Sequence, residues 1–218
     1  MTKSSLFLAV DVGGRHVKVL AQGESERRRF KSDPLLTPER MVVQTLELVD
    51  GWEFDHVSVG VPAPVADGSV VREPVNLGPG WQGFDFEAAF GRPTKVMNDA
   101  AMQALGSYDG GRMLFLGLGT GLGSTMIVDG VIVPMELGHL PFRRATFEEY
   151  VGRAARQRLG PKRWRAAALE TIQHLSAALL PDYVVLGGGL ADELDDLPAG
   201  VRVGGNELAF VGGFRLWE

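Results

Sequence analysis

Two glycine-rich turns in this sequence have the composition of phosphate-binding loops. Asp11-Val-Gly-Gly14 and Gly119-Thr-Gly-Leu-Gly123 each follow an apolar strand. Consecutive glycines expose backbone N–H groups with no side chain in the way, and such a concavity binds phosphate oxygens. Asp11 could hold Mg²⁺ through water, because that ion prefers oxygen ligands, and Thr120 adds a hydroxyl donor. Either turn alone is more typical of a plain hairpin, whereas the two together favour a nucleotide or phosphate site.

A carboxylate stands between a strand and a helix at Asn98-Asp99. A carboxylate near the positive end of a helix stays ionised, and Asp99 could take the proton of an attacking hydroxyl in phosphoryl transfer. Asn and Asp are also the commonest helix N-cap residues. Taken alone, the pair favours that structural role.

Glu136 and His139 lie three residues apart just after a strand. Adjacent sugar hydroxyls each donate and accept hydrogen bonds, so a Glu and a His at this spacing suit two of them. A surface acid and a structural histidine are the alternative, and a metal site lacks a second His or Cys nearby. Glu148 could accept from a further hydroxyl or only complement a helix dipole. Glu149 is expected to form a capping box with Thr146.

The elements that position these residues form two similar halves, each beginning with strand, glycine turn and strand. Strands are expected at residues 6–12, 16–21, 24–31, 57–61, 70–71, 94–97, 113–118, 124–128, 131–133 and 183–186. Helices are expected at residues 37–51, 84–90 and 98–105, after Thr146, and from Gly160-Pro161 to Pro181. A polar, glycine-rich segment at residues 107–111 divides an N-terminal α/β lobe, 1–108, from a C-terminal α/β lobe, 109–218.

Composition excludes several classes of protein. The chain has 218 residues, a net charge of −5 and no cysteine, so disulfides and thiolate metal sites are ruled out. The acidic balance gives no reason to expect nucleic acid or membrane as a partner. The first apolar run is too short for a signal peptide and is interrupted by Asp11. These features fit a cytoplasmic globular protein.

The order and spacing of the motifs resemble those of the ROK sugar kinases (repressor, open reading frame, kinase), and within them the compact polyphosphate/ATP glucokinases. DVGGRHVK resembles the first phosphate motif of that family, and LGLGTGLGSTMIVDG the second. GVPAPV and NLG resemble its sugar-side loops, and NDAAMQALG its catalytic segment. ELGHL and FEEY resemble segments that supply sugar-binding residues, and LGGG resembles the adenosine-side turn.

The resemblance implies the actin/hexokinase/Hsp70-like ATPase fold, which is ribonuclease H-like, with two α/β lobes around a cleft. It implies a kinase that transfers a phosphoryl group from ATP or polyphosphate, with Mg²⁺, to the primary hydroxyl of a hexose, glucose being the first choice. Asp99 would be the catalytic base. Sugar-binding residues would be Asn76, Asn98, Glu136, His139 and Glu148. Donor-binding residues would be Asp11, which also serves Mg²⁺, and Gly13, Gly14, Arg15, Lys18, Gly119, Thr120, Gly121, Gly187, Gly188 and Gly189. A homodimer is expected from the family.

The sequence departs from the family pattern in ways that leave an alternative open. Arg15 replaces the usual Thr or Ser, and it could clamp phosphate or block the site. Ala101 replaces the usual Asn or Asp, and no cysteine-rich loop separates His139 from Glu148, so no structural zinc is expected. Arg15 and Ala101 are the evidence for an alternative, a catalytically impaired sugar- or phosphate-binding protein of the same fold, and the intact Asp99, Glu136 and His139 argue against it.

Two further interpretations concern the donor side. The segment after Gly189 is short, which weakens the case for ATP. A basic stretch between Arg153 and Arg165 could bind polyphosphate, although such a run more often forms a solvated helix face. A generic glycine-rich nucleotide-binding domain would not explain Asn98-Asp99 or the Glu136–His139 pair.

Overall fold

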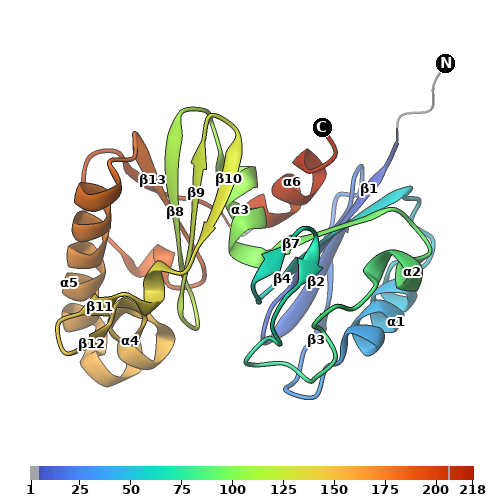
Figure 1. The fold of residues 1–218 in the computed structure, drawn as a ribbon, viewed down its shortest axis with the longest axis horizontal. Helices are drawn as coiled ribbons and strands as arrows, with labels where there is room; N and C mark the ends of the chain where they lie inside the picture. The colour runs from blue at the N-terminus through green and yellow to red at the C-terminus, as the bar shows by residue number, and fades with distance from the viewer. Residues whose placement is uncertain (1–4, 206) are drawn as a thin grey trace. The chain divides into compact units, whose positions relative to one another are not determined.

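The computed structural model describes residues 5–205 and 207–218, and the chain forms two compact units (Figure 1). The first unit contains Met1–Gly106 and Ala209–Glu218, and the second contains Ser107–Leu208. The sequence had assigned all of 109–218 to one lobe. The structure differs, because the final segment returns to the first unit.

A five-stranded mixed sheet, in the order β3-β2-β1-β4-β7, forms the centre of the first unit. Its strands are β1 (Phe7–Val12), β2 (His16–Ala21), β3 (Arg28–Lys31), β4 (His56–Val61) and β7 (Thr94–Asn98). β1 to β3 are antiparallel neighbours, whereas β1, β4 and β7 run parallel. The carboxyl ends of these three parallel strands therefore meet at one edge of the sheet.

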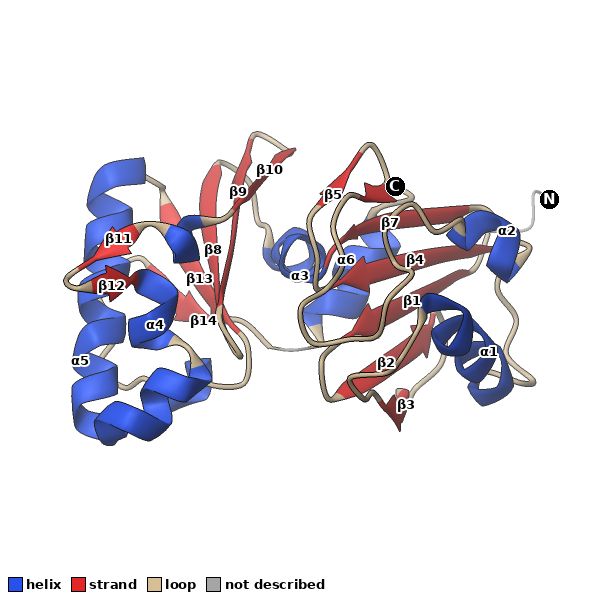
Figure 2. Ribbon diagram, turned by 60° about the horizontal axis from the view of Figure 1, so that its bottom comes forward, coloured by secondary structure: helices blue, strands red, loops and turns tan. Residues whose placement is uncertain are grey.

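Helices cover both faces of this sheet (Figure 2). α1 (Pro38–Leu48) and α2 (Phe86–Phe90) share an apolar core with β1, β2 and β4. α3 (Asp99–Ser107) and α6 (Leu208–Arg215) lie on the other face. Gly213 of α6 allows a close approach there, because a Cβ atom on it would lie 2.7 Å from the Ala9 Cβ.

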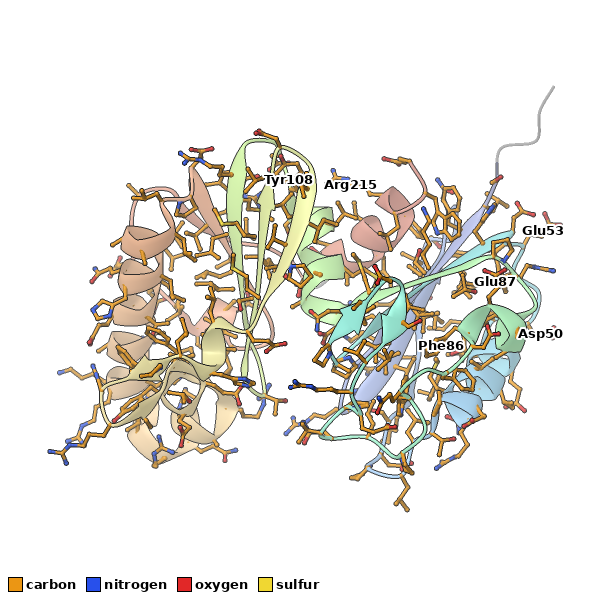
Figure 3. The ribbon with its side chains drawn as sticks, in the orientation of Figure 1. Asp50, Glu53, Phe86, Glu87, Tyr108 and Arg215 are labelled. Atoms are coloured by element: carbon orange, nitrogen blue, oxygen red, sulfur yellow. The ribbon has the colours of Figure 1, made fainter. Side chains whose placement is uncertain are left out.

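Hydrogen bonds fix the end of the chain to the first unit. Arg215, labelled in Figure 3, donates to the Leu105 and Gly106 carbonyls at 2.9 and 3.2 Å. The indole of Trp217 donates to Ser58 Oγ at 2.9 Å. These contacts explain why α6, which the sequence did not predict, belongs to the first unit.

The second unit repeats the arrangement of the first, with a sheet in the order β10-β9-β8-β13-β14. Three antiparallel strands again precede two parallel ones. They are β8 (Arg112–Leu118), β9 (Leu122–Val128), β10 (Val131–Met135), β13 (Tyr183–Gly187) and β14 (Val201–Val203). The expected similarity of the two halves is present in their strand order.

α4 (Phe147–Val151) and α5 (Arg153–Leu179) pack on one face of the second sheet. The Trp164 indole is buried in that core and donates to the Val151 carbonyl at 2.8 Å. The sequence had the last long helix begin at Gly160-Pro161. The structure agrees: α5 consists of two helical segments divided at Gly160, whose φ of 76° and ψ of 166° are not helical, and the second segment begins at Pro161.

Several short elements complete the fold. They are the strands β5 (Val65–Ala66), β6 (Ser69–Val70), β11 (Pro141–Phe142) and β12 (Ala145–Thr146), and the 3-10 turns η1 (Leu137–His139) and η2 (Ala191–Glu193). The capping box of Thr146 and Glu149 at the start of α4 is confirmed. β3 is shorter than expected, because residues 22–27 form a turn. Among the described residues, no helix is long and apolar enough to cross a membrane.

The segment at residues 107–111 is fixed to the second unit. The Tyr108 hydroxyl accepts a hydrogen bond from the Gly130 N–H at 2.9 Å. Arg202 donates to the Ser107 carbonyl and to Asp109 Oδ2, each at 2.7 Å. A segment expected to be a polar linker thus has specific partners.

Candidate active site

The first glycine turn joins β1 to β2, and Ser32, which follows β3, donates hydrogen bonds to two of its carbonyl groups. The Gly13 N–H donates to the His16 carbonyl at 3.0 Å across the turn. Ser32 Oγ donates to the Gly13 carbonyl at 2.6 Å, and the Ser32 N–H donates to the Arg15 carbonyl at 3.1 Å. The Arg15 side chain itself is exposed. The turn is therefore fixed through its carbonyls, which leaves the Arg15 side chain facing solvent.

Two other predicted residues lie beside this turn. Lys18 Nζ lies 2.9 Å from Asp11 Oδ2, and the Asp11 side chain is only 14% exposed. A Cβ atom placed on Gly14 would lie 3.6 Å from the Asn76 Cβ. The first unit thus brings Asn76, expected on the sugar side, next to the predicted phosphate turn.

Asp11 was also the candidate for Mg²⁺. Among the described residues, no group of three or more His, Cys, Asp or Glu side chains could hold a metal ion. Mg²⁺ in phosphoryl-transfer sites keeps several waters and is bound by one or two carboxylates plus the substrate's phosphates. A single half-buried carboxylate at a glycine turn fits that form of binding and does not fit an all-protein cage.

At the end of β7, Asn98 and Asp99 have different local roles. Asn98 Oδ1 accepts from the Ala101 N–H at 3.2 Å, which caps α3, and Asn98 Nδ2 donates to the Ala63 carbonyl at 3.3 Å. Asp99 is the first residue of α3, and its Oδ1 accepts from the Ala100 N–H at 2.8 Å. The capping role that the sequence left open for the pair is performed by Asn98.

Strand register places the first turn and the Asn98–Asp99 pair at the same edge of one sheet. Asp11 is opposite Gly60, and Gly60 is opposite Met97. Two strand spacings amount to roughly 10 Å. Gly60 also permits α3 to approach, because a Cβ atom there would lie 2.5 Å from the Met102 Cε.

Ala101 occupies an interior position on α3 and is 1% exposed. Its methyl group packs inside the first unit. The departure from the family pattern at this position is therefore accommodated by packing.

The second glycine turn joins β8 to β9 and rests on the start of α5. The Gly119 N–H donates to the Gly121 carbonyl at 3.1 Å. The Arg153 N–H donates to the Gly119 and Thr120 carbonyls at 3.0 and 3.2 Å. Gly152 is required at the contact, since a Cβ atom on it would lie 2.6 Å from the Thr120 carbonyl oxygen. The turn is thus ordered by backbone contacts.

Glu148 reaches this turn directly. Its Oε2 accepts from the Leu122 N–H at 3.2 Å. A Cβ atom on Gly121 would lie 1.9 Å from the same oxygen. A residue expected to bind sugar therefore contacts the backbone of a turn expected to bind phosphate.

Glu136 directly precedes η1 and His139 is its last residue, and both are exposed. Buried Ser124 fixes the preceding strand, because its hydroxyl donates to the Met135 carbonyl at 2.8 Å and accepts from the Leu137 N–H at 3.0 Å. Gly138 packs on β9, where a Cβ atom would lie 2.8 Å from the Leu122 carbonyl oxygen. The second glycine turn, η1 and Glu148 therefore meet around Leu122 within the second unit.

The third glycine turn, Gly187–Gly189, follows β13. Gly188 has φ 80°, and a Cβ atom on it would lie 2.3 Å from the Leu118 carbonyl oxygen, so this position requires glycine. The Leu190 N–H donates to the same carbonyl at 3.1 Å. Because β8 and β13 are parallel neighbours, the second and third turns lie at one edge of their sheet.

Sequence reasoning missed two residues that hold the site. Ser32 fixes the first turn across 19 positions of sequence, and Ser124 fixes the segment before Glu136 across 11. Ser32 belongs to no motif, and Ser124 lies within the second phosphate motif without any mark of its contact with the segment before Glu136, because serines at these distances carry no local signal.

Comparison with known proteins identifies the family and the fold. The ROK family profile matches residues 7–157. The polyphosphate glucokinase of Mycobacterium tuberculosis (strain ATCC 25177 / H37Ra) is 28% identical over 212 residues, which cover 85% of this chain and 78% of that protein. The crystal structure of an inorganic polyphosphate/ATP-glucomannokinase from Arthrobacter sp. strain KM superposes with a TM-score of 0.82 at 26% identity, covering 99% of this chain and 100% of that one. A ROK family glucokinase from Streptomyces griseus, solved with glucose and AMPPNP, gives a TM-score of 0.79 at 18% identity, covering 97% and 98%.

These comparisons show that the chain is an α/β protein with the actin/hexokinase-like ATPase fold. The family profile spans more than half of the chain. The chain belongs to the ROK family.

Proposed function

We propose that this protein is a hexose kinase that phosphorylates the primary hydroxyl of glucose, with ATP or polyphosphate as donor. The relatives that support the proposal are a polyphosphate glucokinase and a polyphosphate/ATP-glucomannokinase. A cytoplasmic location and a homodimer are proposed with it, on the family resemblance, and sedimentation velocity tests the latter.

One observation carries the proposal. A glycine turn with an adjacent carboxylate, Asp11, and a second carboxylate at the start of a helix, Asp99, share the carboxyl edge of one parallel strand set. Asp11 lies two strand spacings, roughly 10 Å, from Met97, and Asp99 follows Met97 by two residues, so we place the transferring phosphoryl group and the attacking hydroxyl between the two carboxylates. Two isolated structural features would have no reason to lie at the same edge.

In the proposed reaction, the sugar hydroxyl attacks the terminal phosphoryl group in line. Its proton passes to the Asp99 carboxylate as the phosphorus–oxygen bond to the rest of the donor breaks. Asn98 is already oriented by the Ala63 carbonyl, so its amide can fix a sugar hydroxyl without first losing side-chain freedom. Asn76, Glu136, His139 and Glu148 are the other proposed sugar ligands.

The glycine turns are proposed to bind the donor. Gly13, Gly14, Gly119 and Gly121 would offer backbone N–H groups to phosphate oxygens, and Thr120 and Arg15 would add side-chain donors. Asp11 would hold Mg²⁺ through water, and when bound this ion would neutralise charge on the donor's phosphates. The turn at Gly187–Gly189 is the proposed adenosine side.

A panel of hexoses tests the proposal, with ATP and polyphosphate run in parallel at a fixed Mg²⁺ concentration. Production of hexose 6-phosphate with either donor is expected, glucose being the best acceptor. If no hexose is phosphorylated while glucose still raises the melting temperature, the kinase proposal fails. The protein would then be a sugar-binding member of the family, and Arg15→Thr would be the first reversion to make.

A further inference from the structure

Basic side chains line one face of the β2–β3 hairpin, next to the first glycine turn. Strand register pairs Lys18 with Arg29 and His16 with Lys31. Residues directly opposite on antiparallel strands point to the same face, with Cβ atoms about 5 Å apart. The alternate residues of the hairpin point the other way: Val17 lies in the apolar core and Phe30 packs against it. Lys18, Arg29, His16 and Lys31 therefore share the face opposite to the core.

This face is open over the hairpin. α3 and α6 cover its continuation on β1 and β4, where Gly213 lies against Ala9 and Met102 lies against Gly60. Arg29 and Lys31 lie beyond these contacts and are exposed. The cations are thus accessible to a ligand.

The like charges on this face should lower the stability of the β2–β3 hairpin. Like charges directly opposite each other on a sheet are destabilising. Asp11 offsets one charge through its contact with Lys18 at 2.9 Å. Among the described residues, Arg15, Arg29 and Lys31 have no ion-pair partner. Local conflicts of this kind concentrate at functional sites.

Neighbouring Arg28 shows the contrast. It points to the core face, donates to the Leu48 carbonyl at 2.7 Å and stacks on the Trp52 ring at 4.2 Å. It therefore has a structural role. Among the described residues, Arg29 and Lys31 on the other face make no comparable contact.

The unpaired cations are continuous with the phosphate turn. β3 ends at Lys31, and the next residue, Ser32, is the one that binds the Gly13 and Arg15 carbonyls. The acidic residues of the hairpin, Glu24 and Glu26, lie in the turn at its other end. An anion chain that left the glycine turn in this direction would meet Lys18, Arg29 and Lys31, and the one carboxylate beside them, Asp11, is already paired with Lys18.

We propose that Arg15, Lys18, Arg29 and Lys31, here named the basic strip, bind the non-transferred phosphates of a linear polyphosphate donor. This inference rests on the proposed kinase function and deepens it. The strip offers charge along an open strand edge and presents no aromatic side chain. Single-stranded nucleic acids are bound by stacking platforms as well as by charge, so the strip suits a chain of phosphates without bases.

The basic stretch on α5 is a poorer candidate. Arg156 Nε lies 2.6 Å from Glu193 Oε2, and Arg165 Nη1 lies 3.0 Å from Asp195 Oδ2. Arg158 donates to the Glu149 carbonyl. Because local acceptors engage these side chains, the stretch behaves as the helix face that the sequence favoured. Its exposed pair, Lys162 and Arg163, provides a matched control.

The test compares two double variants that each remove two exposed cations. Arg29→Thr/Lys31→Thr alters the strip with residues that favour strands, and Lys162→Gln/Arg163→Gln alters α5. KM for long-chain polyphosphate, tripolyphosphate and ATP is measured at several salt concentrations, with melting temperatures to confirm folding. The strip variant is expected to raise KM for long-chain polyphosphate about tenfold and to change KM for tripolyphosphate much less. The slope of log KM against log salt should fall by about 1 to 2.

Direct binding separates this inference from the kinase function. Fluorescent long-chain polyphosphate is titrated into each protein without sugar, beside a single-stranded DNA of equal charge. Loss of polyphosphate binding in the strip variant alone supports the strip, even if no hexose is phosphorylated. Unchanged binding, an equal loss in the α5 variant, or DNA binding as tight as polyphosphate binding overturns it, even if ATP supports turnover.

Discussion

The Glu148 carboxylate accepts a hydrogen bond from the Leu122 N–H at 3.2 Å, so an acid after the Glu136–His139 motif rests on the second glycine turn. The same oxygen would lie 1.9 Å from a Cβ atom on Gly121. The position of this carboxylate and the conformation of the turn are therefore linked through contacts within one unit. Because Glu148 is a proposed sugar ligand, a change in this turn should alter the affinity for sugar.

Gly121→Ala is expected to weaken glucose binding although Gly121 belongs to the proposed donor turn. The added methyl group would displace the end of a flexible side chain, so folding should be little affected while the carboxylate loses its position. Loss of one hydrogen bond to a charged group corresponds to about 2 kcal/mol, which is a rise of roughly 30-fold in the dissociation constant for glucose. Isothermal titration without donor measures it.

Gly119→Ala is the matched variant for this test. A Cβ atom at this position would meet no atom within 4 Å, and its φ lies outside the left-handed region. Glucose affinity should remain that of the unaltered protein. Equal losses of glucose affinity in the two variants would show that the effect comes from the turn in general and not from Glu148.

Ser124→Ala and Thr125→Val should have opposite effects on stability, although the residues are adjacent and both buried. Ser124 makes two hydrogen bonds around Glu136, and their loss should lower the free energy of unfolding by about 1–3 kcal/mol and weaken glucose binding. The Thr125 hydroxyl has no hydrogen-bond partner in the described structure, so Val should be neutral or stabilising. Urea unfolding measures the free energy of unfolding of both variants. A destabilised Thr125→Val protein would contradict the conclusion that the Thr125 hydroxyl has no hydrogen-bond partner in the described structure.

Ser32→Ala is expected to loosen the first glycine turn. It removes the 2.6 Å hydrogen bond to the Gly13 carbonyl, worth about 1 kcal/mol. KM for the phosphoryl donor should rise several-fold, while glucose affinity measured without donor should not change. Ser25→Ala, at an exposed position in the hairpin turn, is the control. If the Ser32→Ala protein has an unaltered KM for every donor, Ser32 does not support donor binding.

Local patterns predicted most of the secondary structure. Alternating apolar residues separated by glycines gave the strand pairs around both turns, and Thr37 caps α1 as expected. α6 was missed because Gly212 and Gly213 argue against a helix. It is stabilised by tertiary contact: a Cβ atom on Gly212 would lie 1.8 Å from the Met102 carbonyl oxygen, so the glycines permit close packing.

The candidate site could be predicted where residue type alone signals chemistry. The carboxylates, the imidazole and the glycine turns were chosen as candidates for that reason. The supporting contacts depend on three-dimensional proximity, as when Ser124 meets the Leu137 N–H or Glu148 meets Leu122. The basic strip is intermediate: its residues are visible in the sequence, but only strand register shows that Arg29 and Lys18 share a face.

Replacement of Asp99 by Asn tests the central claim most directly. The variant keeps an oxygen that can accept from the Ala100 N–H, so α3 should remain intact, but it cannot take a proton from the sugar hydroxyl. The turnover number for glucose should fall by about 10²–10⁴, and the dissociation constant for glucose should stay within about threefold. A variant that keeps most of its turnover, or one that loses glucose affinity and turnover in proportion, would contradict the role of Asp99 as the base.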